Sequence, residues 1–379
     1  MKIGILTQPL LTNYGGLLQA YALQTVLKEK GHEAWVINRK YSKPTLILNI
    51  KSKVKRLLAK NVLRNSNLTI NPNLNEEEII AKHTNYFKNK YIHPITDEVF
   101  SDYEMNNMNA LNFDAFIVGS DQVWRPRYSP NIYNYFLDFT NNTPNVLRIS
   151  YAASFGVDNW EFTEEQTEYC SKLSQKFNAI SVRENSGITL CEKHLNAPAT
   201  HVLDPTMLLG VEKYKELIRN ENEPQSQGTL MTYVLDNSED KVKFIQDAAG
   251  NLNLKSFTVM QNAKLSGKST IEDAVFPPVT KWLRGFMDAE FVITDSFHGC
   301  AFAIIFNKPF LALGNRARGI ARFTSLLKLF NLEDRLILDD FSFNNKMIEK
   351  DINWNEVNKS LRKHQEISNL FLDKALIRL

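Results

Sequence analysis

The chain has 379 residues, 43% of them hydrophobic and 23% charged, a composition typical of globular proteins. Its length exceeds one ordinary hydrophobic core, so we expect two domains. The formal net charge of +3 argues against a protein that binds nucleic acid through bulk charge. The three cysteines form neither a CxxC pair nor a plausible zinc set, and we expect no signal peptide and no membrane span. Together these features predict a cytoplasmic protein with reduced thiols.

The chain opens with the pattern of a doubly wound parallel sheet. A strand, a glycine-bearing loop, a helix and a second strand are predicted to follow one another within residues 2–38. Gly15 and Gly16 would let a ligand approach backbone N–H groups where the helix begins. A flexible strand-to-helix turn explains these glycines equally well, because the dinucleotide fingerprint GxGxxG is missing.

Residues 41–112 are predicted to be an insertion of helices and loops after the second strand. Within it, residues 49–64 carry six Lys or Arg among aliphatic side chains, which indicates a basic amphipathic helix. Such a face is usually solvated. It would also suit a peripheral contact with the inner face of an anionic membrane or with a lipid-linked substrate.

Polar residues are predicted at the carboxyl ends of the next strands. Asp121 follows a buried strand and a Gly-Ser turn, where it is either a catalytic carboxylate or a turn aspartate that bonds its own backbone. Arg183 ends a later strand and is either an anion ligand or the partner of an acid such as Glu184. The last strand of this half is expected at residues 201–206.

A second set of strands and helices begins at residue 229 and contains the most informative stretch of the chain. A buried strand ends at Thr294, and Asp295-Ser296-Phe297-His298-Gly299 leads into an apolar helix. Because a helix N-terminus attracts anions, His298 would lie where a phosphate or carboxylate is held. The alternative is a capped turn with a satisfied histidine. Three arginines follow the next strand, at positions 316, 318 and 322.

These patterns predict an α/β protein of two Rossmann-like lobes with a central cleft. The N-terminal lobe is expected at residues 1–210 and the C-terminal lobe at residues 211–350. Residues 351–379 are predicted to form a pair of helices that crosses back to the first lobe. A ligand between the lobes could then touch Asp121, Arg183 and His298.

Six motifs in this order resemble the polysaccharide pyruvyl transferase family. They are Asn13-Tyr14-Gly15-Gly16-Leu17-Leu18-Gln19-Ala20-Tyr21-Ala22-Leu23-Gln24, Gly119-Ser120-Asp121-Gln122-Val123-Trp124, Ser150-Tyr151-Ala152-Ala153-Ser154-Phe155-Gly156, Ser181-Val182-Arg183-Glu184, Leu203-Asp204-Pro205-Thr206 and Thr294-Asp295-Ser296-Phe297-His298-Gly299. The resemblance implies a fold like that of GT-B glycosyltransferases. It also implies transfer of a pyruvyl group from phosphoenolpyruvate to sugar hydroxyls in cell-surface polysaccharide biosynthesis, with formation of a ketal and release of phosphate.

The resemblance also suggests residue roles. It implies catalysis by His298 and Asp121, donor binding by Arg183, Ser296 and Gly299, and acceptor binding by Asn13, Tyr14, Gly15, Gly16 and Trp124. One departure concerns the donor, because the family usually carries an arginine two residues before this histidine and the chain has Ser296. We expect Arg316, Arg318 or Arg322 to supply the missing charge.

The chemistry suits these side chains. His298 could protonate the methylene of the donor, and Asp121 could accept the proton of the attacking hydroxyl. No step needs a metal or a cofactor besides phosphoenolpyruvate as co-substrate, and the expected partner is a saccharide, lipid-linked or nucleotide-linked, not a nucleic acid. Two alternatives are a GT-B-type glycosyltransferase that uses a nucleotide sugar, and a non-catalytic homologue that binds sugars or anions.

Overall fold

The computed structural model describes residues 1–42, 69, 71–143, 145–266, 268–314, 319–338, 341 and 343–377. The predicted basic helix at residues 49–64 lies outside the described residues, as do Arg316 and Arg318. Within the described part of the chain, no helix is both long and apolar enough to span a bilayer.

The N-terminal lobe is built on a six-stranded parallel sheet in the order β2-β1-β3-β4-β5-β6. Its strands are β1 (Lys2–Leu6), β2 (Glu33–Ile37), β3 (Ala115–Val118), β4 (Leu147–Ala153), β5 (Ala179–Val182) and β6 (Thr200–His201). The central strand β3 is buried along its whole length, as its unbroken apolar run predicts for a strand covered on both faces. The predicted last strand at residues 201–206 is wrong in extent, because Pro205 begins a 3₁₀ turn there.

The C-terminal lobe contains a five-stranded parallel sheet in the order β11-β10-β9-β7-β8. Its strands are β7 (Leu230–Tyr233), β8 (Ser256–Thr258), β9 (Phe291–Thr294), β10 (Phe310–Leu313) and β11 (Leu336–Ile337). Strand β9 lies between β7 and β10, so the polar residues after Thr294 emerge at the middle of the sheet's carboxyl edge. The expected fold of two Rossmann-like lobes is confirmed.

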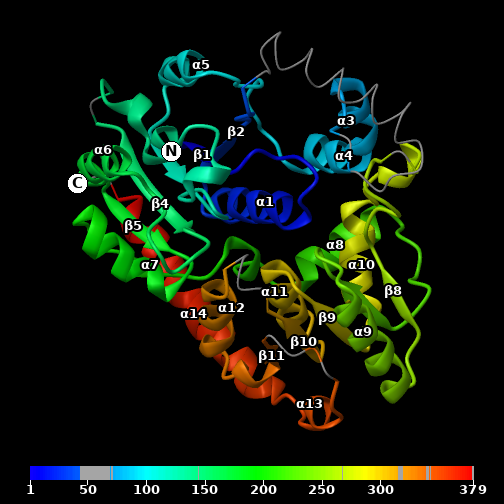
Figure 1. The fold of residues 1–379 in the computed structure, drawn as a ribbon. Coiled ribbons are helices and arrows are strands. Elements are labelled where there is room, and N and C mark those ends of the chain that lie inside the picture. The colour runs from blue at the N-terminus through cyan, green and yellow to red at the C-terminus, as the bar shows by residue number, and fades with distance from the viewer. Residues whose placement is uncertain are drawn as a thin grey trace.

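Helices cover both sheets and fill the space between them (Figure 1). Their bounds are α1 (Tyr14–Glu29), α3 (Leu74–Ile80), α4 (Lys82–Tyr91), α5 (Asp102–Asn106), α6 (Glu164–Ser174), α7 (Asn185–Leu190), α8 (Val211–Asn220), α9 (Glu239–Leu252), α10 (Val279–Asp288), α11 (Phe297–Ile305), α12 (Ala321–Leu329), α13 (Lys346–Glu349) and α14 (Trp354–Ala375). Helices α3 to α5 belong to the predicted insertion, which adds no strand to either sheet in the described residues.

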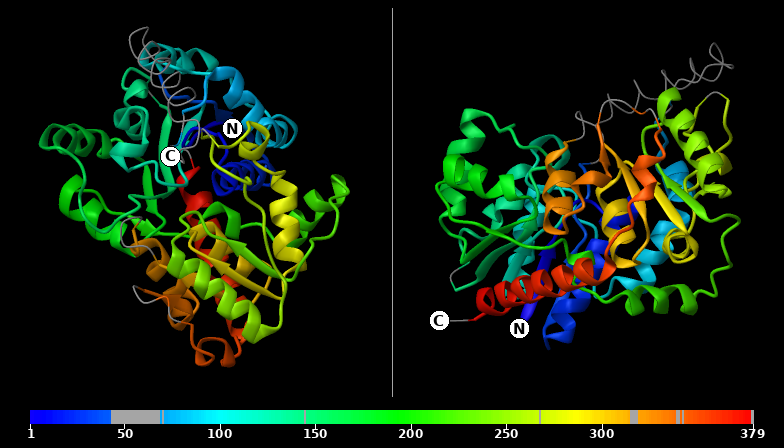
Figure 2. Two further views of the ribbon diagram at one scale, coloured as in Figure 1. Left: turned by 45° about the vertical axis from the view of Figure 1, so that its right-hand side comes forward. Right: turned by 90° about the horizontal axis from the view of Figure 1, so that it is seen from below.

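The C-terminal helix α14 joins the second lobe to the first. It is one continuous helix, so the predicted pair of terminal helices is wrong. Figure 2 shows it running along both lobes toward the N-terminal sheet. There the Ser368 hydroxyl accepts a hydrogen bond from the Leu203 N–H at 3.0 Å, and the Gln365 amide donates to the Met207 carbonyl at 2.7 Å.

The main hydrophobic core continues from one lobe into the other. It combines β1 and α1 of the first lobe with α10 and α11 of the second. Tyr14 is the central contact, because its buried ring packs against Tyr233, Phe276 and Trp282 at centroid distances of 6.3, 6.1 and 5.7 Å. Its hydroxyl donates to the Pro277 carbonyl at 2.9 Å. The first turn of α1 is therefore fixed against the second lobe.

This contact predicts a large cost for removing the Tyr14 ring. Tyr14→Ala should lower the free energy of unfolding by about 3–5 kcal/mol, as for other buried aromatic residues. Tyr14→Phe, which loses only the hydrogen bond to Pro277, should cost about 1 kcal/mol. Denaturant titration of the full chain measures both changes. The matched control is Tyr103→Ala, because Tyr103 is 76% exposed, and equal midpoints for Tyr14→Ala and this control would contradict the packing described here.

Candidate active site between the lobes

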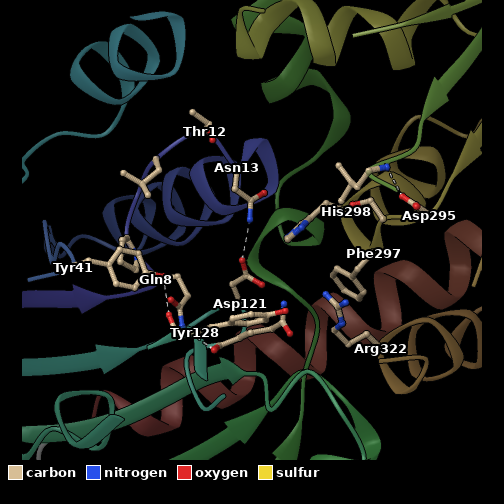
Figure 3. Close-up of a pocket in the computed structure, with 15 residues that line it drawn as sticks. Gln8, Thr12, Asn13, Tyr41, Asp121, Tyr128, Asp295, Phe297, His298 and Arg322 are labelled. Carbon is tan, nitrogen blue, oxygen red and sulfur yellow. Dashed lines mark hydrogen bonds between the residues drawn. The ribbon is translucent and has the colours of Figure 1, made fainter. Parts of the chain in front are cut away.

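A cavity of about 430 Å³ opens between the carboxyl edges of the two sheets (Figure 3). The first lobe contributes Gln8, Pro9, Leu11, Thr12, Asn13, Tyr41, Asp121, Gln122 and Tyr128, and the second contributes Leu235, Asp295, Ser296, Phe297, His298 and Arg322. Asp121 and His298, the two predicted catalytic residues, therefore face the same space. Two helices begin here, α1 after its N-cap Asn13 and α11 after its N-cap Ser296.

Asp121 is held at the cavity by an unusual backbone turn. Gly119 has a φ of 129°, and a side chain there would collide with the Tyr151 carbonyl, since its Cβ would lie 2.0 Å from that oxygen. Asp121 follows with a φ of 65°. One of its carboxylate oxygens accepts from the Asn13 amide at 3.4 Å, so the start of α1 contacts the predicted base directly.

Arg183 lies behind the cavity wall and not in it. Its guanidinium forms ion pairs with Asp121 at 3.4 Å, Glu184 at 3.2 Å and Asp204 at 2.9 Å. Burial lowers the pKa of Arg183, but these three carboxylates outweigh burial and raise that pKa above its usual value. The alternative that Arg183 is the partner of acidic residues is thus what the structure shows, and direct contact between Arg183 and a donor stays a prediction.

His298 lies in the first turn of α11, where the sequence placed it, and only 6% of it is exposed. Its ring packs against α1 so closely that a Cβ on Gly15 would come within 2.1 Å of Nδ1. Gly299 allows a different close approach, between the start of α11 and the end of β9, because a Cβ there would lie 2.1 Å from the Thr294 hydroxyl. Gly15 therefore leaves room for the imidazole against α1, and Gly299 lets α11 begin directly at the end of β9.

Asp204 faces His298 from the first lobe, with Oδ2 at 3.6 Å from Nε2. Burial raises the pKa of Asp204, but His298 and Arg183 outweigh burial and hold that pKa well below its usual range. A buried, ionised carboxylate thus stands behind the imidazole. Asp204 belongs to one of the six motifs, but the sequence suggested no role for it.

Arg322 lies within the described residues, unlike Arg316 and Arg318, and it lines the cavity (Figure 3). Burial, together with the nearby Arg183 cation, lowers the pKa of Arg322 to about 10. The electrostatic cost of this cation would be reduced by an anion in the cavity. Arg322 is the second residue of α12, so a helix and not a loop positions its side chain.

Ser296 lines the cavity as expected, at the N-cap of α11. Its neighbour Asp295 does not cap that helix. The Asp295 carboxylate accepts from the Leu235 N–H at 2.7 Å and forms a buried ion pair with Lys241 at 2.8 Å. Asp295 therefore fixes the loop after β7 at the rim of the cavity.

Several predicted acceptor contacts are corrected by burial. Trp124 is fully buried in the first lobe, stacks on Phe136 at 4.8 Å and donates its indole N–H to the Tyr135 carbonyl at 2.8 Å. Tyr14 packs into the second lobe as described above, and Gly16 donates its N–H to the Asn13 side chain at 3.2 Å. Of the residues at the start of α1, it is Asn13 that reaches the cavity.

Two aromatic residues and a glutamine that line the cavity were not predicted from the sequence. Tyr41 and Tyr128 come from loops without a recognisable motif, and Gln8 precedes α1 in the first loop. Gln8 donates to the Gln122 carbonyl at 2.8 Å, which ties the two loops together. Only the strand-end position of Gln8 could have suggested it.

In the described part of the chain, no His, Cys, Asp or Glu side chains gather in a set that could hold a metal ion, and the expectation that no cofactor is needed stays a prediction.

Solved structures with a similar fold include UDP-N-acetylglucosamine 2-epimerases. The enzyme from Methanocaldococcus jannaschii is 12% identical, with a TM-score of 0.52 over 98% of this chain and 100% of the epimerase. The enzyme from Rickettsia bellii is 10% identical, with a TM-score of 0.50 over 99% of this chain and 96% of the epimerase. At this identity the likeness concerns the fold, and it confirms the expected GT-B-like architecture.

No curated protein sequence gives a significant match. The family model described as polysaccharide pyruvyl transferase matches residues 13–316, most of the chain, from the start of α1 to beyond β10. The matched segment includes Asp121 and His298, which line the cavity, and Asp204, which lies behind His298. The chain therefore belongs to the polysaccharide pyruvyl transferase family.

Proposed function

We propose that the protein transfers a pyruvyl group from phosphoenolpyruvate to the hydroxyls of a sugar, forming a ketal and releasing phosphate. One observation carries the proposal: in a member of this family, a histidine, a carboxylate and an arginine line one interlobe cavity. These three groups are an acid, a base and an anion ligand, which are the functions that the reaction needs.

The donor would bind at the second-lobe side of the cavity. Arg322 supplies a cation, and the N-terminus of α11 supplies N–H groups and a favourable dipole for phosphate or carboxylate. Arg322 thereby replaces the arginine that the family usually carries at the position of Ser296. The bidentate geometry of a guanidinium suits either anionic group of the donor.

The proposed reaction begins with protonation of the donor's methylene carbon by His298, which leaves an oxocarbenium centre at the neighbouring carbon. A sugar hydroxyl attacks this centre while Asp121 accepts its proton. The bond between that carbon and the phosphate oxygen then breaks, phosphate leaves, and a second hydroxyl completes the ketal. One hydroxyl proton balances the new methyl hydrogen, and the other leaves with phosphate.

The acceptor would lie on the first-lobe side, near Asp121. Asn13 and Gln8 offer amides, and Tyr41 and Tyr128 offer aromatic faces and hydroxyls, a combination suited to a sugar ring. We propose an acceptor carried on a lipid or a nucleotide during assembly of a cell-surface polysaccharide.

The direct test is release of phosphate from phosphoenolpyruvate by the purified chain. We expect release only when a suitable glycan is present, together with a gain in glycan mass that matches one pyruvyl ketal. His298→Gln should reduce the rate by at least about 100-fold, since it removes the general acid. Stabilisation by nucleotide sugars but not by phosphoenolpyruvate in a thermal-shift screen would instead favour a glycosyltransferase.

Arg322→Gln should weaken binding of phosphoenolpyruvate by roughly 10- to 100-fold, because one charge-assisted hydrogen-bonding group is lost. Titration calorimetry with the isolated protein measures this without an acceptor. Arg362→Gln on the exposed face of α14 is the matched control and should leave the dissociation constant unchanged. Equal affinities for the two variants would move the donor site away from Arg322.

Gly15→Ala should reduce kcat by about 100-fold or more, because the added methyl group would displace the His298 ring. Steady-state kinetics on phosphate release measures the loss. Gly250→Ala is the control: it lies in α9 with open space around its Cβ position, so activity should persist and stability should rise by up to about 1 kcal/mol. A fully active Gly15→Ala variant would show that the close contact with His298 is not needed.

A further inference from the structure

We propose that Asp204 is a positioning residue for His298, and that Arg183 couples this pair to Asp121 so that acid and base are aligned across the two lobes. The kinetic part of this inference rests on the proposed pyruvyl transfer. The structural part concerns the imidazole and its carboxylate, and it can be tested without any substrate.

The first observation is the buried nitrogen of His298. Its Nε2 is shielded from solvent and makes no hydrogen bond to the described residues. The Asp204 carboxylate at 3.6 Å is its ion-pair partner. A buried polar nitrogen without a hydrogen bond is costly, so a small movement of the ring toward Asp204 would be favourable. With Nε2 facing Asp204 and Nδ1 lying against Gly15, the orientation of the ring is fixed on both sides.

The second observation is that Asp204 cannot rotate away. Its Oδ1 accepts from both the N–H of Thr206 at 3.0 Å and the Thr206 hydroxyl at 2.8 Å. Its Oδ2 accepts from Arg183 at 2.9 Å and from the Ser120 hydroxyl at 3.2 Å. Four donors therefore fix the carboxylate, and Oδ2 is the oxygen that faces His298. A fixed anion at this place selects one ring orientation.

The third observation is the position of Arg183 between the two candidate catalytic side chains. Its guanidinium contacts Asp204 and Asp121 at the same time, and it stacks over the Phe297 ring at 4.3 Å. Phe297 directly precedes His298, so Arg183 touches the second lobe next to the acid while it holds the base. The geometry of the acid and the base is thus set by one shared cation.

The kinetic test compares Asp204→Asn with Glu184→Gln. Both variants remove one buried carboxylate charge from Arg183, but Glu184 contacts neither His298 nor Asp121 in the described structure. We expect Asp204→Asn to lower kcat by at least about 100-fold, with the KM for phosphoenolpyruvate within about threefold of the parent. Glu184→Gln should lower the thermal stability about as much as Asp204→Asn does, but it should lower kcat far less. Equal kcat losses in the two variants, or none in Asp204→Asn, would overturn the positioning role.

The second test is NMR spectroscopy of the full chain with ¹⁵N-labelled histidine, in which His298→Gln identifies the resonance of interest. We expect a proton on Nε2 of His298 in the parent, and a mixture of tautomers in Asp204→Asn. A parent that carries its proton on Nδ1, or a tautomer unaffected by Asp204→Asn, would refute the inference. If the parent transfers no pyruvyl group and the tautomer still depends on Asp204, the proposed function fails and the pairing stands.

Discussion

The site depends on one buried cation. Arg183 is neutralised by Asp121, Glu184 and Asp204, and the excess negative charge of that group is balanced in part by Arg322 and by any positive charge on the imidazole of His298. Removing one partner of a buried ion pair is costly, because the remaining charge stays desolvated. The carboxylates that face the cavity are therefore held in place before any ligand arrives, which is the kind of preorganisation that electrostatic catalysis requires.

Much of the fold could be predicted from the sequence, because unbroken apolar runs such as Ala115–Val118 specify buried parallel strands. Asp121 and His298 were predicted to line one cleft because each follows the carboxyl end of a parallel strand, and the structure places both on the same cavity. The sequence pattern could not reveal that Trp124 is buried away from the cavity or that Arg183 is paired with carboxylates. Both facts depend on contacts with segments distant in the sequence. Arg183 and Asp121 are 62 positions apart, and nothing local indicates their pairing.

Under the proposed function, Arg322 supplies the charge that the arginine expected at the position of Ser296 would carry. The usual arginine would project from the first residues before α11, whereas Arg322 reaches the cavity from α12, beyond the next strand. Ser296 is small, so the N-terminus of α11 stays open to a ligand. A guanidinium on α12 would approach a bound anion from a different direction than one at position 296. This difference would alter the shapes of donor and acceptor that fit the cavity.

The continuous core around Tyr14 has a consequence for the autonomy of the lobes. The two lobes share the largest hydrophobic cluster, a hydrogen bond from Tyr14 to Pro277 and the long helix α14, so separating them would expose part of the core of each. A chimaera that exchanges a whole lobe between relatives, to obtain a new sugar specificity, would need side chains that pack together at the interlobe contact around Tyr14 and α14. Exchanging only the loops that carry Tyr41 and Tyr128 would leave this interlobe contact unchanged and is the more practical way to alter specificity.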